Sequence, residues 1–561
     1  MSNVALKRAN TQLKFHCAEQ TNKQKVRIPY TSAIKMWWVW LIVAVVIAVL
    51  VIFVLTPLLY ICYKRNYWRW HNVPFEPPAP EFEILQRLFG LRPTLEWEEL
   101  EHYDLLYRNF KGRSPFCGFY HLMQPRALIL DRELIMQILI KNFSNFNDRG
   151  IYHNSKHDPL SADLYSRRGS EWKEMRLRLE PIFAKDEMRY LYDGLRESSA
   201  EWLLGFDQLV RNERAHSGYI EIRTQIRRYV LTTLAACVFD LTAARQEKYP
   251  LNVFEDMTHL EHTTSRHSEF ANAFLRRYPR LGKKMKLRTT SKEVEDYFTG
   301  LITEVVNERE QSSTEKKDYM QLLVNLMQQE LSTHEVEDQT MKELKEHLMG
   351  ELAAHAISFL KAGLRPTTHT LTYILYELAL NDPIQEQLRA EIEVALKRHN
   401  NELTYDCLRE LKFLGQVISE TIRLHPVVPY LIRRTLTDFP VLSDNKYVLP
   451  KNMFIIVPTH AIHNDAEYYP EPFIFKPERF GREDNKRRDI CMWLGFGEGP
   501  RSCIGLHFAQ LIMRLLLVQL ITRYHFTVDR TRLMVKPQNV IRLRVDPLDE
   551  QADGREADVV I

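Results

Sequence analysis

The chain has 561 residues, of which 45% are hydrophobic, so it is long enough to bury a large core. Its 76 Lys and Arg nearly balance its 72 Asp and Glu, and a net charge of +4 argues against nucleic acid or another polyanion as a partner. The seven cysteines are scattered and include no CxxC pair, which excludes a dense disulfide framework and favours a reducing compartment for most of the chain.

A long uncharged segment lies near the N-terminus, between Lys35 and Lys64. Residues 36–63 exceed the roughly 20 apolar residues that span a bilayer, so they predict a transmembrane anchor surrounded by membrane lipid. Tryptophan and tyrosine residues at the two ends suit the headgroup regions. The apolar run is too long for a signal peptide. Basic residues flank both ends, so the charges do not decide the orientation of this helix.

Two polar segments flank the predicted anchor. Residues 1–35 form a basic N-terminal extension with seven Lys or Arg and one Glu. Because Met36 directly precedes the apolar run, we predict that an appreciable fraction of the protein starts at Met36. Residues 64–80 form a basic and Pro-rich linker whose four prolines favour a stiff, extended spacer.

The remaining sequence predicts one large body, residues 81–545, followed by a polar C-terminal tail, residues 546–561. It contains no internal repeat and no second clear linker. Strand-like runs, such as 447–457, are short and few, so the predicted fold class is mainly α with a minor β-sheet. Apolar residues recur at helical spacing in eight segments, 131–141, 169–183, 186–209, 221–239, 292–311, 340–380, 383–399 and 407–424.

The longest predicted helix, residues 340–380, carries Arg365 and Pro366 side by side near its middle. A proline inside a helix removes one N–H donor and pushes against the carbonyl four residues earlier, here that of Ala362, at a cost of roughly 3 kcal/mol. The pair therefore predicts a distortion of this helix.

A glycine-rich stretch near the C-terminus, FGEGPRSCIG at residues 496–505, carries the clearest chemical signal. Its glycines give the backbone unusual freedom, and an apolar helical pattern begins directly after it. Cys503 would thus stand at a helix N-terminus beside Arg501, where the helix dipole and the guanidinium both favour a thiolate. Such a cysteine could bind a metal ion.

This stretch resembles the haem-binding loop of the cytochrome P450 superfamily, F-G-x-G-x-R-x-C-x-G, and fits it at every position. The resemblance covers about residues 75–545 and is greatest for the microsomal insect branch. It implies haem b as the cofactor, with Cys503 as the axial thiolate ligand of the iron. It further implies that Phe496 packs near the thiolate and that Arg501 pairs with a haem propionate.

Other segments follow in the order that this family requires. Four residues match positions that contact the haem propionates, namely Trp172, Arg176, Arg433 and His463. A further set resembles the structural group that holds the cysteine loop in this family, namely Glu420, Arg423 and Arg479. The resemblance therefore implies that distant parts of the chain converge on one haem site.

The resemblance fails at the middle of the long helix. Arg365 stands where the family has Asp or Glu, and Pro366 stands where it has Thr. In the family this acid and alcohol relay protons during oxygen activation. Thr367 follows directly and is the candidate catalytic hydroxyl, but a helix turns about 100° per residue, so its side chain should point away unless the distortion at the proline turns it back.

These observations predict a membrane-bound haem-thiolate monooxygenase that oxidises an apolar small molecule with O2. The chain has no flavin or nicotinamide motif, so electrons would come from a separate NADPH-dependent flavin reductase, for which the basic run 486–488 is a candidate docking site. We expect an endoplasmic reticulum (microsomal) membrane protein with its catalytic domain in the cytosol, and poor coupling of NADPH consumption to product. Two alternatives stay open: a haem-thiolate isomerase or dehydratase of a pre-oxidised substrate, and a largely inactive haem-binding protein.

Overall fold

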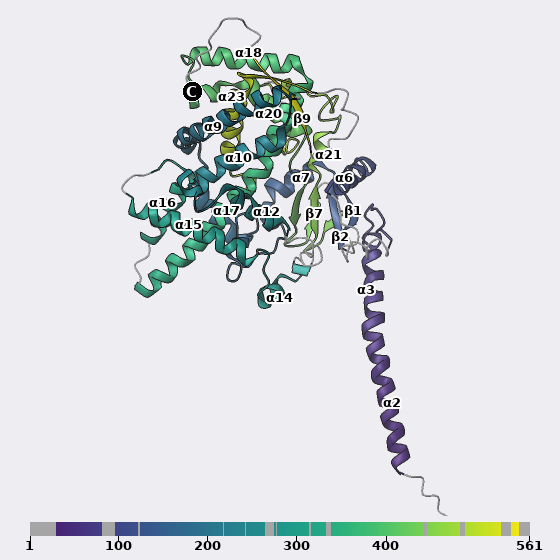
Figure 1. Ribbon diagram of the computed structural model, residues 1–561. Coiled ribbons are helices and arrows are strands. Elements are labelled where there is room, and N and C mark those ends of the chain that lie inside the picture. The colour runs from purple at the N-terminus through teal and green to yellow at the C-terminus, as the bar shows by residue number, and fades with distance from the viewer. Residues whose placement is uncertain are drawn as a thin grey trace, which may run out of the picture. The chain divides into compact units, whose positions relative to one another are not determined.

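The chain forms two units, Met1–Tyr67 and Trp68–Ile561 (Figure 1). The structure is a computed structural model and describes residues 30–80, 96–121, 124–216, 218–241, 243–263, 274–275, 278–312, 316–332, 338–441, 446–482, 489–528 and 540–548. Three predicted features lie largely or wholly outside the described residues, namely the N-terminal extension 1–35, the basic run 486–488 and the C-terminal tail 546–561.

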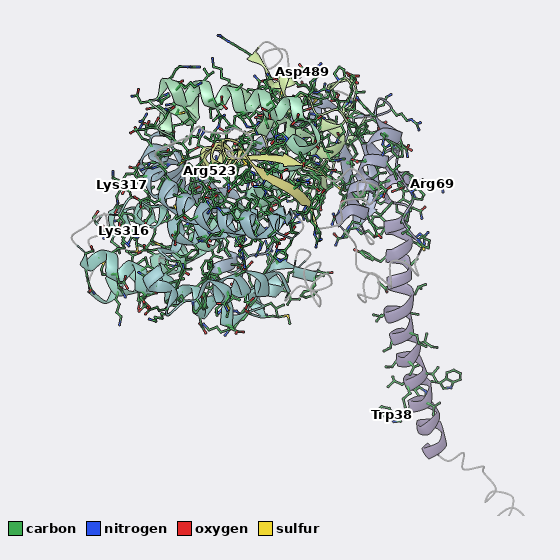
Figure 2. The ribbon with its side chains drawn as sticks, turned by 45° about the horizontal axis from the view of Figure 1, so that its top comes forward. Trp38, Arg69, Lys316, Lys317, Asp489 and Arg523 are labelled. Atoms are coloured by element: carbon green, nitrogen blue, oxygen red, sulfur yellow. The ribbon has the colours of Figure 1, made fainter. Side chains whose placement is uncertain are left out.

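In the first unit, the apolar segment forms three consecutive helical pieces, α2 (Tyr30–Leu50), a π-helical turn η1 (Val51–Leu55) and α3 (Thr56–Arg65). Their described apolar side chains are exposed, and Trp38 projects from α2 (Figure 2). No helix among the residues that the structure describes is both long enough and apolar enough to cross a membrane.

The second unit is mainly helical, as the sequence predicts, and two small sheets and one short strand pair accompany the helices. The larger sheet has the order β1-β2-β7-β4, in which only the β2–β7 pair is parallel. The second has the order β3-β9-β8, and β5 pairs with β6. The strands are β1 (Phe116–His121), β2 (Gln124–Ile129), β3 (Tyr219–Glu221), β4 (Leu431–Arg434), β5 (Phe439–Pro440), β6 (Val448–Leu449), β7 (Phe454–Val457), β8 (Tyr524–Thr527) and β9 (Arg542–Pro547).

The helices pack around α17 (Asp338–Leu380), which contains Pro366 and is helical along its whole length. The helix α10 packs so closely on α17 that a Cβ atom at Gly363 would lie 3.0 Å from Leu234 Cδ1. The longer helices of this unit are α6 (Glu96–Phe110), α8 (Gly169–Leu179), α9 (Lys185–Arg214), α10 (Ile222–Phe239), α12 (Leu251–Thr263), α15 (Lys292–Gln311), α16 (Tyr319–Ser332), α18 (Asp382–Arg398), α20 (Lys412–Leu424) and α23 (Leu506–Ile521). The shorter helical segments include α7 (Arg132–Met136), η2 (Gln137–Lys141), η4 (Pro159–Ser161), η5 (Glu180–Phe183), α14 (Pro279–Lys284), α19 (Tyr405–Glu410), α21 (Thr459–His463) and η7 (Pro477–Phe480).

The helix α9 shows why these segments are helical. Its buried side chains recur every three or four residues and form one apolar face toward the core. Acidic residues occupy its first turn and basic residues its last turn, which suits the helix dipole. The buried positions are Met188, Leu191, Tyr192, Leu195, Ser199, Leu203, Phe206 and Val210.

The prediction of a single helix over 407–424 is wrong, because the chain leaves the helical conformation at Leu411, which has ψ 88°. The segment forms α19 and α20. The carboxylate of Glu391 on α18 accepts hydrogen bonds from the N–H groups of Phe413 and Leu414, at 2.7 and 2.9 Å. A second helix N-terminus is thus stabilised by a residue of another helix, which periodicity along the segment does not reveal.

The strand-like run 447–457 also differs from its prediction. It divides into β6 and β7, which belong to different sheets. Asn452, with φ 63°, makes the turn between them, a conformation that asparagine adopts more readily than most residues. Alternating apolar residues alone did not indicate this turn.

Candidate functional site

The glycine-rich loop holds Cys503 immediately before α23. Gly497 and Gly499 have φ angles of 72° and 75°, and a Cβ atom at Gly499 would lie 2.0 Å from the carbonyl oxygen of Leu139 in η2. The N–H of Cys503 donates to the carbonyl of Phe496 at 2.8 Å, which closes the loop. Glycine is therefore required at position 499 both by the backbone conformation and by the contact with η2.

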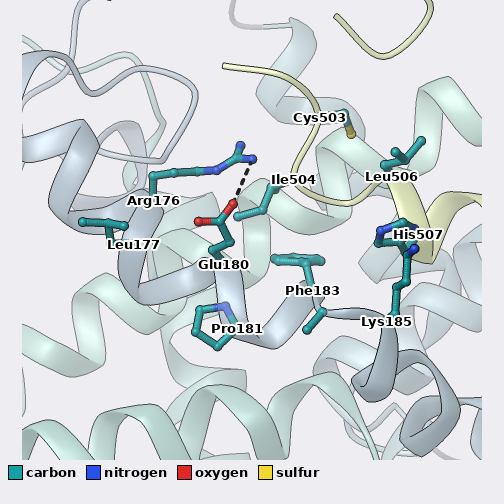
Figure 3. A pocket seen from close by; sticks show the side chains of 11 residues that line it. Arg176, Leu177, Glu180, Pro181, Phe183, Lys185, Cys503, Ile504, Leu506 and His507 are labelled. Atoms are coloured by element: carbon teal, nitrogen blue, oxygen red, sulfur yellow. Dashed lines mark ion pairs between the residues drawn. The ribbon is translucent and has the colours of Figure 1, made fainter. Parts of the chain in front are cut away.

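Cys503 opens into a cavity of about 430 Å³ between α8, η5 and the start of α23 (Figure 3). Arg176 reaches across to the loop, where its Nη1 donates to the carbonyl of Ser502 at 2.8 Å. Glu180 pairs with Arg176 at 3.8 Å, as the dashed line in Figure 3 marks. The side of this cavity that faces α8 is thus charged, and Phe183 and Leu506 add apolar surface.

The charged group that the sequence placed beside the Cys503 thiol is not among those that shift the pKa of this thiol. Burial raises its pKa, while an N–H donor at Gly505 and the charges of Arg176 and Arg149 act in the opposite direction. Arg501 is not among the groups that stabilise the thiolate. Its guanidinium instead donates to backbone carbonyls of the segment before α8, those of Leu164 at 3.4 Å, Tyr165 at 3.3 Å and Arg167 at 2.5 Å.

Three arginines gather near this loop, and we call Arg149, Arg433 and Arg501 the arginine cluster. Arg433 is 2% exposed and Arg501 is 5% exposed, and in both the buried Nε atom has no hydrogen-bond partner among the described residues. Burial and the charge of Arg149 lower the pKa of Arg433 to about 9. Burial and the charges of Arg149 and Arg433 lower the pKa of Arg501 to about 8.

A guanidinium keeps its proton in a protein, so these shifts express mutual repulsion and desolvation of three cations. The neighbouring carboxylate of Asp148 is already engaged by Arg434 and, at 3.6 Å, by Arg168. A buried cluster of this kind requires an anion. Two carboxylate groups would supply it and would also accept from the two unpartnered Nε atoms.

Trp172 and Phe496 are the aromatic residues that the sequence assigned to this site. The ring of Trp172 packs under Arg501, whose Cζ lies 4.5 Å from the ring centroid, and against Phe143. Phe496 provides the carbonyl that accepts from the N–H of Cys503, and its ring lies 6.0 Å from that of Trp493. The structure thus brings Trp172, Arg433 and Arg501 into one site, next to the loop.

His463 belongs to a different group. Its Nε2 accepts from the N–H of Leu494 at 2.8 Å, and its carbonyl accepts from Arg423 at 2.8 Å. Arg423 in turn donates twice to Glu420, at 2.7 and 2.9 Å, and both side chains are fully buried. Arg479 lies 3.3 Å from the same carboxylate. These residues join α20, α21 and η7 to the segment that precedes the cysteine loop.

The middle of α17 carries two exposed residues. Between residues 351 and 380 only Ala362 and Arg365 are exposed, and they are three residues apart on one face. Thr367 is 6% exposed and does not share this face. Burial and the charges of His425, Arg223 and Arg365 lower the pKa of His369 to about 4, with burial the largest cause. The exposed face of α17 therefore presents a cation.

Arg149 is the member of the site that the sequence did not indicate. It stacks on Tyr165 at 4.0 Å, and its Nη1 donates to the carbonyl of Tyr165 at 3.2 Å. No motif or helical spacing marks it, because its role arises only where its segment meets β4 and the cysteine loop. The charge repulsion described above is the observation that reveals it.

A cysteine at the head of a helix, next to buried arginines that require two carboxylates, fits a haem-thiolate oxidoreductase, because the cofactor carries both an iron atom and two propionates. Comparison with known sequences agrees with this class. The sequence model of the family described as "Cytochrome P450" matches residues 77–546. The chain therefore belongs to the cytochrome P450 family, whose members bind haem b through an axial cysteine thiolate and are monooxygenases.

Its similarity to individual members extends over nearly the whole chain. It is 43% identical to "Probable cytochrome P450 317a1" of Drosophila melanogaster over 522 residues, which cover 93% of this chain and 99% of that protein. It is 34% identical to "Cytochrome P450 6a2" of the same organism over 493 residues, covering 87% and 95% of the two chains. For "Cytochrome P450 6a8", also of this organism, the identity is 33%, and the coverage is 83% and 90%. The similarity to the insect branch predicted from the sequence is confirmed.

Proposed function

We propose that this chain is a membrane-bound monooxygenase in which Cys503 is the axial ligand of haem iron and the arginine cluster binds the propionates. The observation that supports this most directly is the pair of buried, unpartnered Nε atoms of Arg433 and Arg501 beside the cysteine loop. When bound, the haem activates O2 so that one oxygen atom enters the substrate and the other leaves as water.

The chain's own residues position this cofactor. Arg176 holds the loop through the carbonyl of Ser502, and Gly499 lets the loop approach η2 closely enough to fix the direction of Cys503. The buried Glu420–Arg423 pair fixes the segment that precedes the loop. Together these contacts hold the loop that carries Cys503.

The test of this assignment is the carbon monoxide spectrum of the reduced protein. We expect Cys503→Ser to abolish the red-shifted band of the thiolate-ligated haem. As a matched control, Cys491→Ser changes a buried cysteine close to the loop and should keep the band. A Cys503→Ser variant that retains the band would show that another residue binds the iron.

We further propose that residues 36–63 anchor the protein in the endoplasmic reticulum membrane, with the body in the cytosol and a separate NADPH-dependent flavin reductase as electron donor. The exposed apolar side chains of α2 support this, because lipid would cover them. Membrane fractionation tests the location. We also propose that part of the protein starts at Met36, and N-terminal peptide mass spectrometry that finds only longer forms would contradict it.

The exposed face of α17 bears on proton supply. Arg365 cannot donate a proton as a carboxylic acid does, and the buried Thr367 does not face the same space as Ala362. We therefore propose that water delivers protons to the site and that coupling of NADPH consumption to an oxidised apolar substrate is poor. The same observation is also compatible with two alternative functions. These are an isomerase or dehydratase of a pre-oxidised substrate, and a haem-binding protein with little turnover. NADPH consumption measured together with product and hydrogen peroxide distinguishes them.

A further inference from the structure

A second cavity, of about 620 Å³, lies at the C-terminal end of α17 and shares no lining residue with the cavity at Cys503. Its volume is within the range of small-molecule sites, about 300–1,000 Å³. Aromatic side chains form much of its wall, two from α17 and two from the loop before η7. They are Tyr373, Tyr376, Phe473 and Phe475.

Glu377 is the one carboxylate among the described residues that line this cavity. Glu377 is 6% exposed, and its Oε1 accepts from Nε2 of His425 at 2.6 Å, whereas its Oε2 accepts no hydrogen bond from the described residues. Asn464 donates through Nδ2 to the carbonyl of His460 at 3.0 Å, and its buried Oδ1 has no hydrogen-bond partner among the residues that the structure describes. The described lining residues include no Lys or Arg.

The two histidines at the cavity each direct one ring nitrogen to a carboxylate. His425 directs its Nε2 to Glu377 and stacks on Tyr373, with ring centroids 4.2 Å apart. His460 directs its Nδ1 to Asp104 at 2.8 Å. The groups still able to bind a ligand therefore include a carboxylate oxygen of Glu377, the hydroxyl groups of the two tyrosines and the rings of Tyr376, Phe473 and Phe475.

We propose that this cavity binds a small organic cation with an aromatic or apolar body, such as a protonated or quaternary amine. Aromatic faces attract cations through the ring quadrupole, and Glu377 supplies the opposite charge in a partly desolvated position. An anion would meet the carboxylate of Glu377, and the described lining residues include no Lys or Arg that would offset this charge. Phe473 is 77% exposed, so its ring is free to close over the ligand at the rim.

This site lies outside the monooxygenase site, and the proposal does not depend on turnover. The ring of Tyr373 lies 4.6 Å from that of His369, which is four residues after Arg365. A bound cation would thus be in contact with α17, the helix that carries Arg365.

The test is binding of phenyltrimethylammonium to the haem-loaded protein, measured by equilibrium dialysis. The quaternary nitrogen has no lone pair, so the probe cannot bind iron as simple amines do. We expect saturable binding, and binding of the neutral isostere tert-butylbenzene about 10-fold weaker or less, as cation–π attraction and one ion pair predict. Equal binding of the two molecules, or no binding of the cation, would overturn the proposal.

Variants locate the bound probe. Glu377→Gln keeps an acceptor for His425 but removes the charge, and we expect about 10-fold weaker binding of the cation and no change for tert-butylbenzene. Phe473→Ala changes an exposed rim residue that folding does not need, and it should weaken binding about threefold or more. The control Leu204→Ala changes an exposed residue of α9 and should have no effect. If Phe473→Ala and Glu377→Gln both bind the probe normally, the probe binds elsewhere and the assignment is wrong.

Discussion

Replacing Arg433 by methionine is expected to change the stability of the haem-free and haem-loaded protein in opposite directions. Arg433 is almost fully buried among like charges, and these surroundings lower its pKa from 12.5 to about 9. At 1.36 kcal/mol per pKa unit this corresponds to a penalty of about 5 kcal/mol for holding the charge. Relaxation and water penetration reduce such penalties, so we expect Arg433→Met to stabilise the haem-free form by about 2 kcal/mol.

In the haem-loaded protein the same change removes one partner of a propionate. We expect weaker haem retention and a lower free energy of unfolding, by about 2 kcal/mol or more. The assay is urea unfolding of both forms, with haem transfer to an acceptor protein as a second measurement.

A matched control is available in Arg389, which is also buried but donates to the carbonyls of Ile521 at 3.0 Å and Tyr524 at 3.1 Å. Arg389→Met should destabilise both forms, because it leaves those carbonyls unpaired. If Arg433→Met destabilises the haem-free protein as much as Arg389→Met does, the repulsion inferred for the arginine cluster does not exist.

Three further outcomes are expected. Combining Arg365→Glu with Pro366→Thr should raise the fraction of NADPH that yields product instead of hydrogen peroxide, and an unchanged fraction with haem still bound would show that this pair does not limit coupling. Gly499→Ala should lower the free energy of unfolding by about 2 kcal/mol or more and reduce haem content. In the control Gly205→Ala the added Cβ meets no described atom within 4 Å, so this change should be neutral or stabilising. Equal effects of the two substitutions on stability would contradict the close contact between Gly499 and η2. Desolvation of its imidazole lowers the pKa of His355 to about 4, so protonation favours unfolding and stability should fall as the pH drops from 6.5 to 4. His355→Gln should flatten that part of the urea-midpoint profile against pH, and an unaltered profile would contradict the desolvation of a neutral imidazole.

The cysteine loop and the long helix could be predicted from the sequence because their signals are local. The glycines of the loop are needed where the backbone has positive φ, and α17 follows an apolar period that continues through Pro366. Both features depend on residues close together in the chain, so spacing alone revealed them.

The contacts of the site could not be predicted in the same way. Arg501 was matched to a propionate contact, but its sequence gave no sign that it also donates to carbonyls more than 300 residues earlier. His463 was grouped with the propionate contacts, but the structure places its Nε2 on the N–H of Leu494. Arg149 carries no motif at all. Each of these depends on tertiary contacts between segments whose own patterns are unremarkable.

The order of the site residues along the chain has a consequence for synthesis. Arg149 precedes Cys503 by 354 positions, and at about 5–20 residues per second the ribosome needs roughly 20–70 s to pass from one to the other. During that time the proposed iron ligand does not yet exist, so haem can enter only at the end of translation. Until haem binds, the three arginines of the arginine cluster would repel one another in the newly made protein. Supply of haem to the cell should therefore determine how much of the nascent protein escapes degradation.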